Sequence, residues 1–451
     1  MTEALFPRSF KKSYPQAVRG EGCYIITADD HRILDAAGSA AVVSIGHGRA
    51  EVAATMAAQA RQLAFAHTSQ FQTEIAERLA QRVRALAPAG FREAGRVYFT
   101  SGGSEATETA LKLARQYHLE RGQPQRVRML ARRQSYHGST LGALSVSGNV
   151  SRRSPYTPIL AHWGHIAPCF CYHCPLGKTF PECKLACADE LDGLIQYSGP
   201  QNVAAFLFEP LSGATLGAAV PPEGYLQRIA ETCRKHGVLL IADEIMTGMG
   251  RTGAPFAVDH WGVEPDMILV GKGLASGYAP LGAVIAAPHV AEAIASGSGA
   301  FPHGFTFQAH PVSMAAGHAV LDILEREQLF DRVTPAGQFL RHALEPLTAS
   351  PVIGDIRGRG LLLGVEFVRD RKIRFPFPPT PSVAERVRQI AWEHNVAVYP
   401  MQGCLDGTAG DHVLLAPPFT LGEAEAEEIA RALEAAAANL ASGRPRLPDK
   451  V

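Results

Sequence analysis

Short apolar runs alternate with amphipathic stretches through the middle of the chain. Amphipathic stretches at residues 105–118 and 223–236 predict helices, the second of them ended by Gly237. Continuous apolar runs, each followed by a loop and a helix, are typical of a mostly parallel sheet that is covered on both faces. The pattern therefore predicts an α/β fold, with strands at Arg96–Thr100, Val203–Phe208, residues 238–242 and Met267–Val270.

The pattern changes after about residue 312. The sequence IRGRGLLLGVEFV predicts a turn that leads into a strand, and the segments AVY and HVLLA predict a pair of strands. The last ten residues predict a frayed tail. Helices are expected at residues 314–327, 336–347 and 383–395 and from residue 421. Together these elements predict a smaller α+β domain.

Three parts are expected along the chain, since 451 residues are enough for two to three domains. Residues 1–60 are predicted to form an N-terminal segment that packs with the small domain. Residues 61–312 are predicted to form the large domain, and residues 313–451 the small one.

Composition narrows the class of protein. Lysine plus arginine (43) balance aspartate plus glutamate (43), so no net charge favours nucleic acid or an anionic membrane as a partner. No apolar stretch approaches twenty residues, so no transmembrane helix is expected. The N-terminus has no apolar run that could be a signal peptide. We therefore expect a cytoplasmic protein whose eight cysteines are reduced.

A glycine pair follows the predicted strand that ends at Thr100. The sequence Ser-Gly-Gly-Ser, with Gly103 and Ser104, comes just before a predicted helix. Free backbone N–H groups and the positive end of the helix would meet there, which suits a phosphate. The alternative is an ordinary helix start, capped by Ser101 or Ser104.

Other polar residues fall at or after the predicted strands and in loops. Tyr136 and His137 stand in a loop where an aromatic ring could stack on a flat cofactor. An ordinary surface loop would give the same sequence pattern. Glu209 closes a buried strand, where a carboxylate needs a partner or loses its charge. Thr306 offers a hydroxyl in a loop and indicates little by itself.

Asp243 and Lys272 each follow a buried strand. An aspartate in that place is either a structural cap or the partner of a protonated ring nitrogen, as in pyridoxal-phosphate enzymes. Lysines are seldom buried unless they are used, and Lys272 stands between two glycines. A phosphate-binding P-loop is excluded, because glycine follows Lys272 and Asp266 stands where that motif needs glycine. A desolvated lysine amine is instead suited to a Schiff base.

These motifs resemble the class III (omega-type) aminotransferases, pyridoxal-phosphate enzymes of fold type I. The matching stretches are FTSGGSEATETALKLAR, YHGSTLGALS, FEP, LLIADEIMTGMGRTG, VGKGLASGYAPLGA, HGFTFQAHP, IRGRGLLLGVEF and LAPPF. They occur in the order of the family and extend from about residue 34 to about residue 440. The resemblance implies a large domain with a mostly parallel sheet covered by helices and a smaller α+β domain.

The resemblance also implies roles for individual residues. Lys272 would carry pyridoxal phosphate and transfer the proton, and Asp243 would bind the pyridine nitrogen. Tyr136 and Ile245 would lie on the two faces of the ring. The cofactor-binding residues implied in this way are Gly103, Ser104, Tyr136, His137, Glu209, Asp243, Ile245, Lys272 and Thr306. Thr306 would reach the phosphate of the other subunit, so the family implies a homodimer with shared sites, or a tetramer built from it.

The chain departs from the family at positions that bind a substrate carboxylate. Ser139, Tyr399 and Leu415 stand where branches of the family carry an arginine. A carboxylate normally binds a bidentate arginine, so specificity for glutamate and 2-oxoglutarate is not expected. We expect an amine or ω-amino acid as donor and a small 2-oxo acid as acceptor, with pyruvate favoured, in a ping-pong reaction.

Five cysteines lie within nineteen residues, between Cys169 and Cys187, with His165 and His173 nearby. The spacing could hold zinc or an iron–sulfur cluster, but it lacks two C-x2-C pairs. We interpret them as reduced structural thiols and expect no metal site. Two alternatives to the transaminase stay open: a decarboxylase or aminomutase with the same cofactor, and a metal-dependent redox or scaffold protein built on the cysteines.

Overall fold

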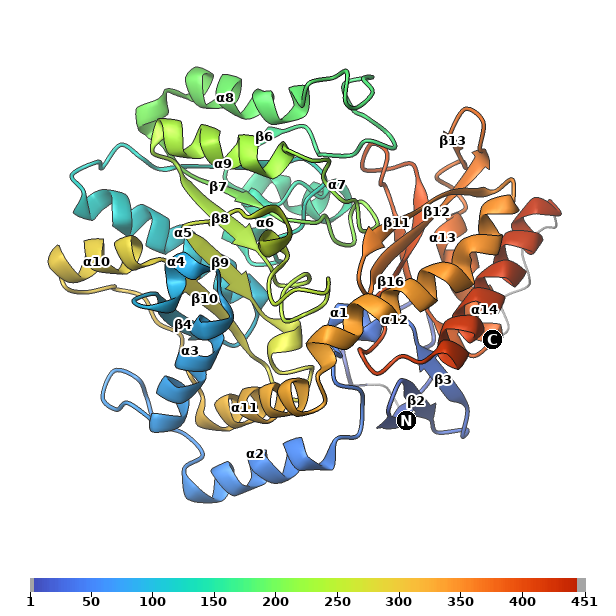
Figure 1. The fold of residues 1–451 in the computed structure, drawn as a ribbon, viewed down its shortest axis with the longest axis horizontal. Coiled ribbons are helices and arrows are strands. Elements are labelled where there is room, and N and C mark those ends of the chain that lie inside the picture. Colours follow the sequence, from blue (N-terminus) through green and yellow to red (C-terminus); the bar gives the residue numbers. More distant parts are fainter. Residues whose placement is uncertain (1–3, 444–451) are drawn as a thin grey trace.

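A seven-stranded sheet lies at the centre of the larger part of the molecule (Figure 1). The structure is a computed structural model and describes residues 4–443. All neighbouring strands are parallel except β10, which is antiparallel to both of its neighbours. The strand order is β4 (Arg96–Thr100), β10 (Gly282–Ala286), β9 (Met267–Val270), β8 (Leu239–Asp243), β7 (Val203–Phe208), β5 (Arg128–Arg132) and β6 (Gly164–Ile166). The predicted mostly parallel sheet is confirmed.

Both faces of this sheet are buried, as its continuous apolar strands require. Along β9, Ile268 and Val270 join one core, whereas Met267 and Leu269 join the other. The first core includes helices α3 (Glu74–Leu86), α8 (Ala186–Ser198), α9 (Tyr225–His236) and α11 (Pro311–Arg326). The second includes α5 (Gly103–Glu120), α6 (Leu141–Val146) and α10 (Pro288–Ser296). Short helices α1 (Gly38–Ala41), α4 (Ala89–Arg92) and α7 (Val150–Arg153) lie in the connections.

An antiparallel sheet forms the smaller part of the molecule (Figure 1). Its strands are β11 (Ile353–Arg359), β12 (Leu362–Asp370), β16 (Asp411–Leu415) and β15 (Tyr399–Gln402), with β13 (Phe375–Pro376) paired to β12. The helices α12 (Leu329–Leu344), α13 (Val383–Glu393) and α14 (Glu423–Ala441) contact one another or the sheet. The α+β character expected after residue 312 is therefore seen.

Three local predictions in this part were incomplete or wrong. The predicted turn into a strand is present at Gly360, where φ is +58°, and it leads into β12, but residues 356–359 before it belong to strand β11, which was not predicted. Helix α12 begins at Leu329 and not at residue 336, since the buried residues Leu329 and Val333 extend its apolar stripe across Pro335. The segment AVY divides between β14 (Val396–Ala397) and β15, and only β15 pairs with β16.

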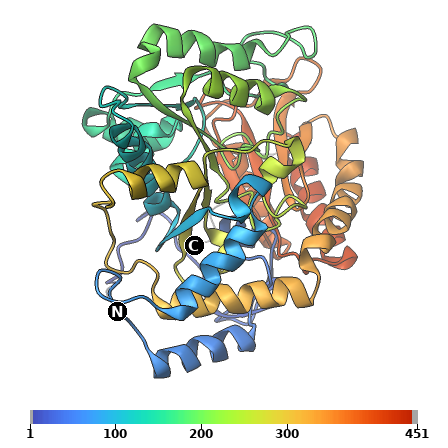
Figure 2. The same ribbon diagram turned by 60° about the vertical axis from the view of Figure 1, so that its left-hand side comes forward.

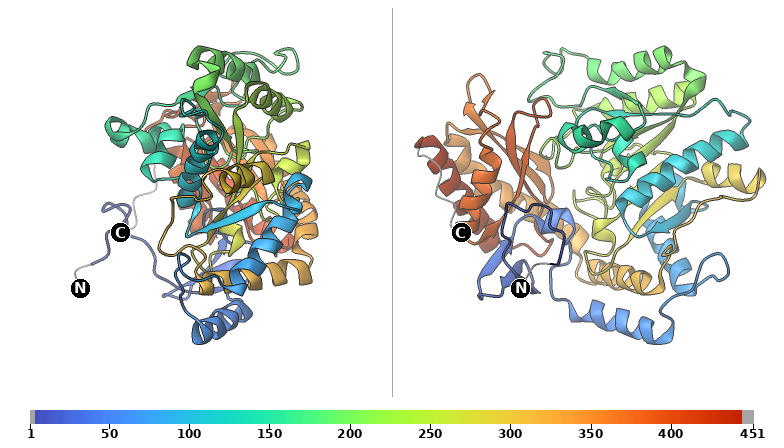
Figure 3. Two further views of the ribbon diagram at one scale, coloured as in Figure 1. Left: turned by 90° about the vertical axis from the view of Figure 1, so that its left-hand side faces the viewer. Right: turned by 180° about the vertical axis from the view of Figure 1, so that it is seen from behind.

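The N-terminal strands belong with the small sheet region. Strands β1 (Ala17–Glu21), β2 (Tyr24–Thr27) and β3 (Arg32–Asp35) form a sheet in which β3 pairs with β14 near the other end of the chain. Figure 3 shows these strands beside the C-terminal helices. Helix α2 (Ala50–Gln62) packs instead against α11 (Figure 2). The domain boundaries near residues 60 and 312 stay predictions, and the predicted frayed tail lies mostly outside the described residues.

Within residues 4–443, no helix is both long enough and apolar enough to cross a membrane.

Candidate active site

The carboxyl ends of β4, β7, β8 and β9 lie at one edge of the large sheet. Three of these strands are parallel neighbours, and β4 has their direction because both β4 and β9 are antiparallel to β10. In open α/β sheets, this edge is where ligands bind. The residues predicted for the site follow these ends: Gly103 and Ser104 after β4, Glu209 after β7, Asp243 at the end of β8 and Lys272 after β9.

Asp243 is held by two hydrogen-bond donors. Its side chain is 5% exposed, and its Oδ2 lies 2.7 Å from Nδ1 of His137. The backbone N–H of Ile245 donates to Oδ1 at 3.1 Å. Two donors stabilise the charged form of a buried carboxylate. The two contacts therefore fix the position of the Asp243 carboxyl group at the sheet edge.

His137 is positioned by contacts of its own backbone. Its N–H donates to Oγ of Ser147 at 2.8 Å, and its carbonyl accepts from the hydroxyl of Thr107, on α5, at 2.6 Å. Its Nε2 is buried and has no hydrogen-bond partner among the described residues. The loop is thus fixed to α5, and the imidazole is held against Asp243. The sequence placed His137 in a loop that could contact a flat cofactor, and its contact with Asp243 comes from the fold.

Lys272 follows β9 in an unusual backbone conformation. Its φ is +39°, a region that side-chain-bearing residues rarely adopt and that persists only where the surrounding structure imposes it. Burial lowers the pKa of its amine to about 8, against the opposing effect of the Asp243 carboxylate; the Arg251 guanidinium lowers it further. A lysine with this pKa has a substantial neutral fraction near neutral pH, as a nucleophilic amine requires.

Ile245 is packed between two glycines that come from different strand ends. A Cβ at Gly103 would lie 3.1 Å from Ile245, and a Cβ at Gly271 would also lie 3.1 Å from it. The glycines therefore allow this side chain to approach the sheet edge closely. Its apolar surface lies beside Lys272, where one face of a flat ring could rest.

The start of α5 has the features of an anion site. No side chain caps it, so the alternative of an ordinary cap by Ser101 or Ser104 is not seen. Oγ of Ser104 instead accepts from the N–H of Ser139 at 3.0 Å, and Glu105 accepts from the N–H of Ser101 at 2.8 Å. The N–H groups of Gly103 and Ser104 lie in the first turn, where a helix offers them no acceptor. They are free to bind a phosphate.

Glu209 lies next to this set in a buried position. Burial raises the pKa of its carboxyl group. Oε1 accepts from the N–H of Gly213 at 3.1 Å, and Oε2 has no hydrogen-bond partner among the described residues. The neighbouring Arg132 donates to the Glu209 carbonyl at a distance of 2.5 Å. A buried carboxylate with one free oxygen can accept a donor from a bound molecule.

Tyr136 and Thr306 are placed differently. Tyr136 is half-buried, and its hydroxyl is 2.8 Å from Oγ of Ser139. The guanidinium of Arg152 lies over its ring, 4.7 Å from the centre. Thr306 is exposed, beside the exposed Phe307, and is not joined to the other site residues within this chain. The motifs gave no signal for Arg152, which lies in an unremarkable SRRSP segment.

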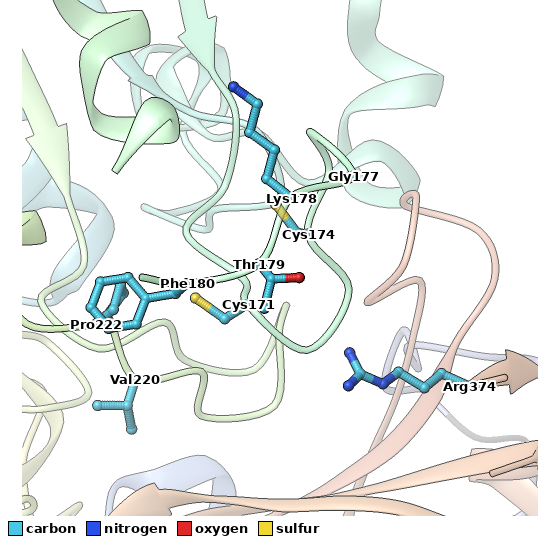
Figure 4. A pocket seen from close by; sticks show the side chains of 9 residues that line it. All are labelled: Cys171, Cys174, Gly177, Lys178, Thr179, Phe180, Val220, Pro222 and Arg374. Atoms are coloured by element: carbon cyan, nitrogen blue, oxygen red, sulfur yellow. The ribbon is translucent and has the colours of Figure 1, made fainter. Parts of the chain in front are cut away.

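The cysteine segment lies outside this site. Within residues 4–443, no three histidine, cysteine, aspartate or glutamate side chains are arranged to hold a metal ion. His173 Nε2 is 2.6 Å from a carboxylate oxygen of Glu366, so that imidazole has a partner elsewhere. Cys171 and Cys174 line a pocket together with Phe180 and, opposite, Arg374 (Figure 4). No predicted cofactor-binding residue lines it.

Comparison with known proteins identifies the family. Residues 7–437 match the family aminotransferase class-III. The chain is a class III aminotransferase. This aminotransferase is 40% identical to an uncharacterized aminotransferase of Schizosaccharomyces pombe over 95% of its own length and 94% of the relative. It is 35% identical to diaminobutyrate–2-oxoglutarate transaminase of Halomonas elongata, over 92% and 88% of the two chains.

The fold comparison agrees. An amine transaminase from an uncultivated Pseudomonas species, in its pyridoxal-phosphate-bound form, superposes with a TM-score of 0.90 at 36% identity, covering 97% of this chain and 98% of the other. The predicted fold type I is therefore confirmed, and the cofactor of this aminotransferase is pyridoxal phosphate. The site fits it: a lysine with a lowered pKa, a buried carboxylate, an uncapped helix start and an apolar wall lie at one edge.

Proposed function

We propose that this aminotransferase moves an amino group from an amine or an ω-amino acid to a small 2-oxo acid, with pyruvate favoured over 2-oxoglutarate, in a ping-pong reaction. The observation that carries the proposal is Lys272, whose amine has a pKa lowered to about 8, beside Asp243, which His137 and Ile245 hold as a carboxylate. The choice of acceptor rests on Ser139, Tyr399 and Leu415. Ser139 and Leu415 stand at arginine positions of acetylornithine-type members, and Tyr399 stands at that of the ω-amine:pyruvate branch, so all three positions lack a guanidinium.

Lys272 has two tasks in this proposal. When bound, pyridoxal phosphate supplies an aldehyde for the amino group and a ring that stores electrons from the donor carbon. The neutral Nζ of Lys272 would hold the cofactor covalently until a donor amine takes its place. Nζ is then free to take the proton from the amino-bearing carbon of the donor and to hand it on. A pKa near 8 suits both directions of that transfer.

The other residues position the cofactor. The carboxylate of Asp243 would accept the N–H of the pyridine ring and keep that nitrogen protonated. The His137 imidazole orients Asp243 through its Nδ1 contact. Tyr136 and Ile245 would hold the two faces of the ring, and the N–H groups of Gly103 and Ser104 would bind the phosphate. Glu209 lies near the substrate and offers its free oxygen to the bound amine.

A homodimer with shared sites is part of the proposal. Thr306 is exposed in this chain and lies in a loop with Phe307, whose side chain is 59% exposed. The ring centres of Phe307 and the exposed Phe65 are 6.0 Å apart, which forms an apolar surface beside Thr306. Such a surface favours association with a second copy, whose phosphate Thr306 would reach. The cytoplasmic location stays a prediction.

A panel of donors tests the proposal. Protein loaded with pyridoxal phosphate is mixed with diamines, β-alanine, taurine, aromatic amines and α-amino acids, against pyruvate and 2-oxoglutarate. Loss of the cofactor absorbance on addition of donor alone, and its return with pyruvate, is the expected result. Release of carbon dioxide, or turnover without a second substrate, would favour the decarboxylase or the aminomutase instead. Absence of any reaction across the panel would overturn the proposal.

A further inference from the structure

Arg152 lies beside Tyr136 and has no acidic partner among the described residues. It belongs to α7, which Asn149 caps by accepting from the N–H of Arg152 at 3.0 Å. Its guanidinium lies 4.7 Å from the ring centre of Tyr136. In the part of the chain that the structure describes, none of the ion pairs within 4.0 Å involves Arg152. Its hydrogen-bond donors are therefore available to a bound molecule.

Other arginines near the site have fixed partners. Arg357 pairs with Glu366 at 2.6 Å and with Asp355 at 3.2 Å. Arg132 donates to the Glu209 carbonyl, and Arg251 donates to carbonyl groups of the small sheet region and of the N-terminal segment. These guanidinium groups already have hydrogen-bond or ion-pair partners within the chain. Arg152 differs from them in having only an aromatic contact.

The charge of Arg152 acts on the same space as Lys272. It is among the groups that lower the pKa of the Lys272 amine. The two groups therefore lie within electrostatic range of each other. Tyr136, which holds one face of the cofactor ring in the proposed function, lies directly beside Arg152.

A loop of the small sheet region contacts the start of α7. A Cβ on Gly407 would collide with Val150, the first residue of α7. Nε2 of Gln134 donates to the carbonyl groups of Gly403 and Cys404 at 3.1 and 2.8 Å, which fixes the start of the same loop. No residue of α7 is fully buried, and Arg152 is half-buried. An ion pair with a half-buried guanidinium is stronger than one in bulk water.

We propose that Arg152 binds the carboxylate of the substrate and supplies the guanidinium that is missing at Ser139, Tyr399 and Leu415. The ligand class is a short ω-amino acid as donor, or a small 2-oxo acid as acceptor. A guanidinium binds a carboxylate with two parallel hydrogen bonds, a geometry that a lysine does not reproduce. The inference rests on the proposed function and adds the residue that selects acids over plain amines.

Two donors that differ only in the carboxylate test the proposal: β-alanine and propylamine, each with pyruvate. The quantity measured is the ratio of kcat/KM for β-alanine to that for propylamine, in the unmodified protein loaded with pyridoxal phosphate and in Arg152→Gln. Hydrogen bonds to a charged group predict a fall of about 10- to 100-fold in this ratio. Arg152→Lys should recover only part of it. A ratio in Arg152→Gln within about threefold of the unmodified value would overturn the proposal.

The control variant is Arg121→Gln. Arg121 also lies over a tyrosine ring, 5.5 Å from the centre of Tyr117, but at the far end of α5 from the site. In Arg121→Gln, the ratio of kcat/KM for β-alanine to that for propylamine should equal the ratio of the unmodified protein. Thermal unfolding of all variants shows whether each is folded, and Arg152→Lys keeps the test decisive if Arg152→Gln fails to fold.

Binding of propionate gives a second readout that needs no turnover. Propionate has the carboxylate but neither an amino nor an oxo group, so it binds without reacting. Its Kd, measured by calorimetry, should rise about 10- to 100-fold in Arg152→Gln; an unchanged Kd would contradict the assignment. If the unmodified protein uses propylamine but Arg152→Gln leaves the ratio unchanged, the assignment fails and the transaminase stands. If neither donor reacts, the donor panel described above decides the proposed function, and the propionate titration still decides Arg152.

Discussion

Two groups of reactive side chains stand out in the sequence, and the fold treats them differently. The residues around Lys272 come from strand ends that are far apart in the sequence: His137 and Asp243 are separated by 106 positions, yet Nδ1 and Oδ2 lie 2.7 Å apart. The cysteines between Cys169 and Cys187 are close in sequence, but with the other described residues they form no group of three that could hold a metal ion.

The difference lies in what positions each group. Parallel strands carry their last residues to one edge, so Asp243 and Lys272 converge because the sheet converges. The cysteine segment runs from a turn after β6 to the first turn of α8, and no sheet edge collects its thiols. Cys169 is buried whereas Cys171 is exposed. Density of reactive residues in a sequence is thus weaker evidence for a site than their placement at strand ends.

Replacement of Lys272 by alanine should give the largest effect. It removes both the amine that holds the cofactor and the group that moves the proton, and the proton transfer alone is worth about 10²- to 10⁴-fold. The rate of transamination with the best donor should fall by at least that factor, and the absorbance of the covalently held cofactor should disappear. Lys235→Ala, on the surface beside Asp192, is the control and should keep both. Full turnover by the Lys272 variant would refute the role of this amine.

Asp243→Asn should have the next largest effect. The amide keeps the shape of the side chain but loses the charge that keeps the ring nitrogen protonated. Loss of a hydrogen bond to a charged group predicts a fall of about 10- to 100-fold in kcat. Rapid-mixing measurements of the donor half-reaction check this prediction. Asp192→Asn, at a half-buried aspartate on α8 away from the site, is the matched control. If the Asp243 variant reacts at the unmodified rate, the carboxylate is only a structural cap.

Much of this site could be predicted from the sequence, because buried parallel strands have an unmistakable pattern. Strands β4, β7 and β9 begin and end at the predicted residues, which is why Glu209 and Lys272 could be placed at the sheet edge. The partners of these residues could not be predicted. Arg152 reaches Tyr136 only through the fold of α7.

The small sheet region was predicted less well for a physical reason. In IRGRG, alternating glycine and arginine suggest a turn, yet β11 pairs with β12 through this segment, and Arg357 is held by Glu366 from the neighbouring strand. Cross-strand pairing of this kind depends on tertiary contacts and leaves no local pattern. Helix α12 passes through Pro335 for a similar reason, since the buried residues on both sides pack against the core.

The lowered pKa of Lys272 predicts how the stability of the apoprotein depends on pH. In the folded chain the amine titrates at about 8, and in the unfolded chain at the ordinary value of 10.5. Between these values the unfolded chain binds more protons, so the contribution of this group to the free energy of unfolding rises with pH. Below about pH 8 the amine is protonated in both states, and the destabilisation caused by its burial is fully present. Tyrosine and cysteine groups also titrate in this range. The measured quantity is therefore the difference in unfolding free energy between Lys272→Met and the unmodified apoprotein.

Urea unfolding at several pH values gives that difference. Lys272→Met should be the more stable protein at pH 7.5, and its advantage should shrink as the pH rises from about 8 toward about 10. A difference that does not change with pH would show that the amine titrates at its ordinary value, and the nucleophilic role would lose its physical basis. Lys235→Met is the control, because Lys235 lies exposed on α9.

The smallest effects are expected in the cysteine segment. Cys171 is exposed, so Cys171→Ser should change the free energy of unfolding by no more than about 0.5 kcal/mol and leave transamination within about twofold. Cys169 is buried, and Cys169→Ser places a hydroxyl in an apolar environment, at a cost of about 1–3 kcal/mol. Metal analysis of untagged protein should find less than one ion per chain. One zinc or iron per chain, lost together with folding stability in Cys171→Ser, would show that these thiols converge after all and would remove the contrast with the Lys272 site.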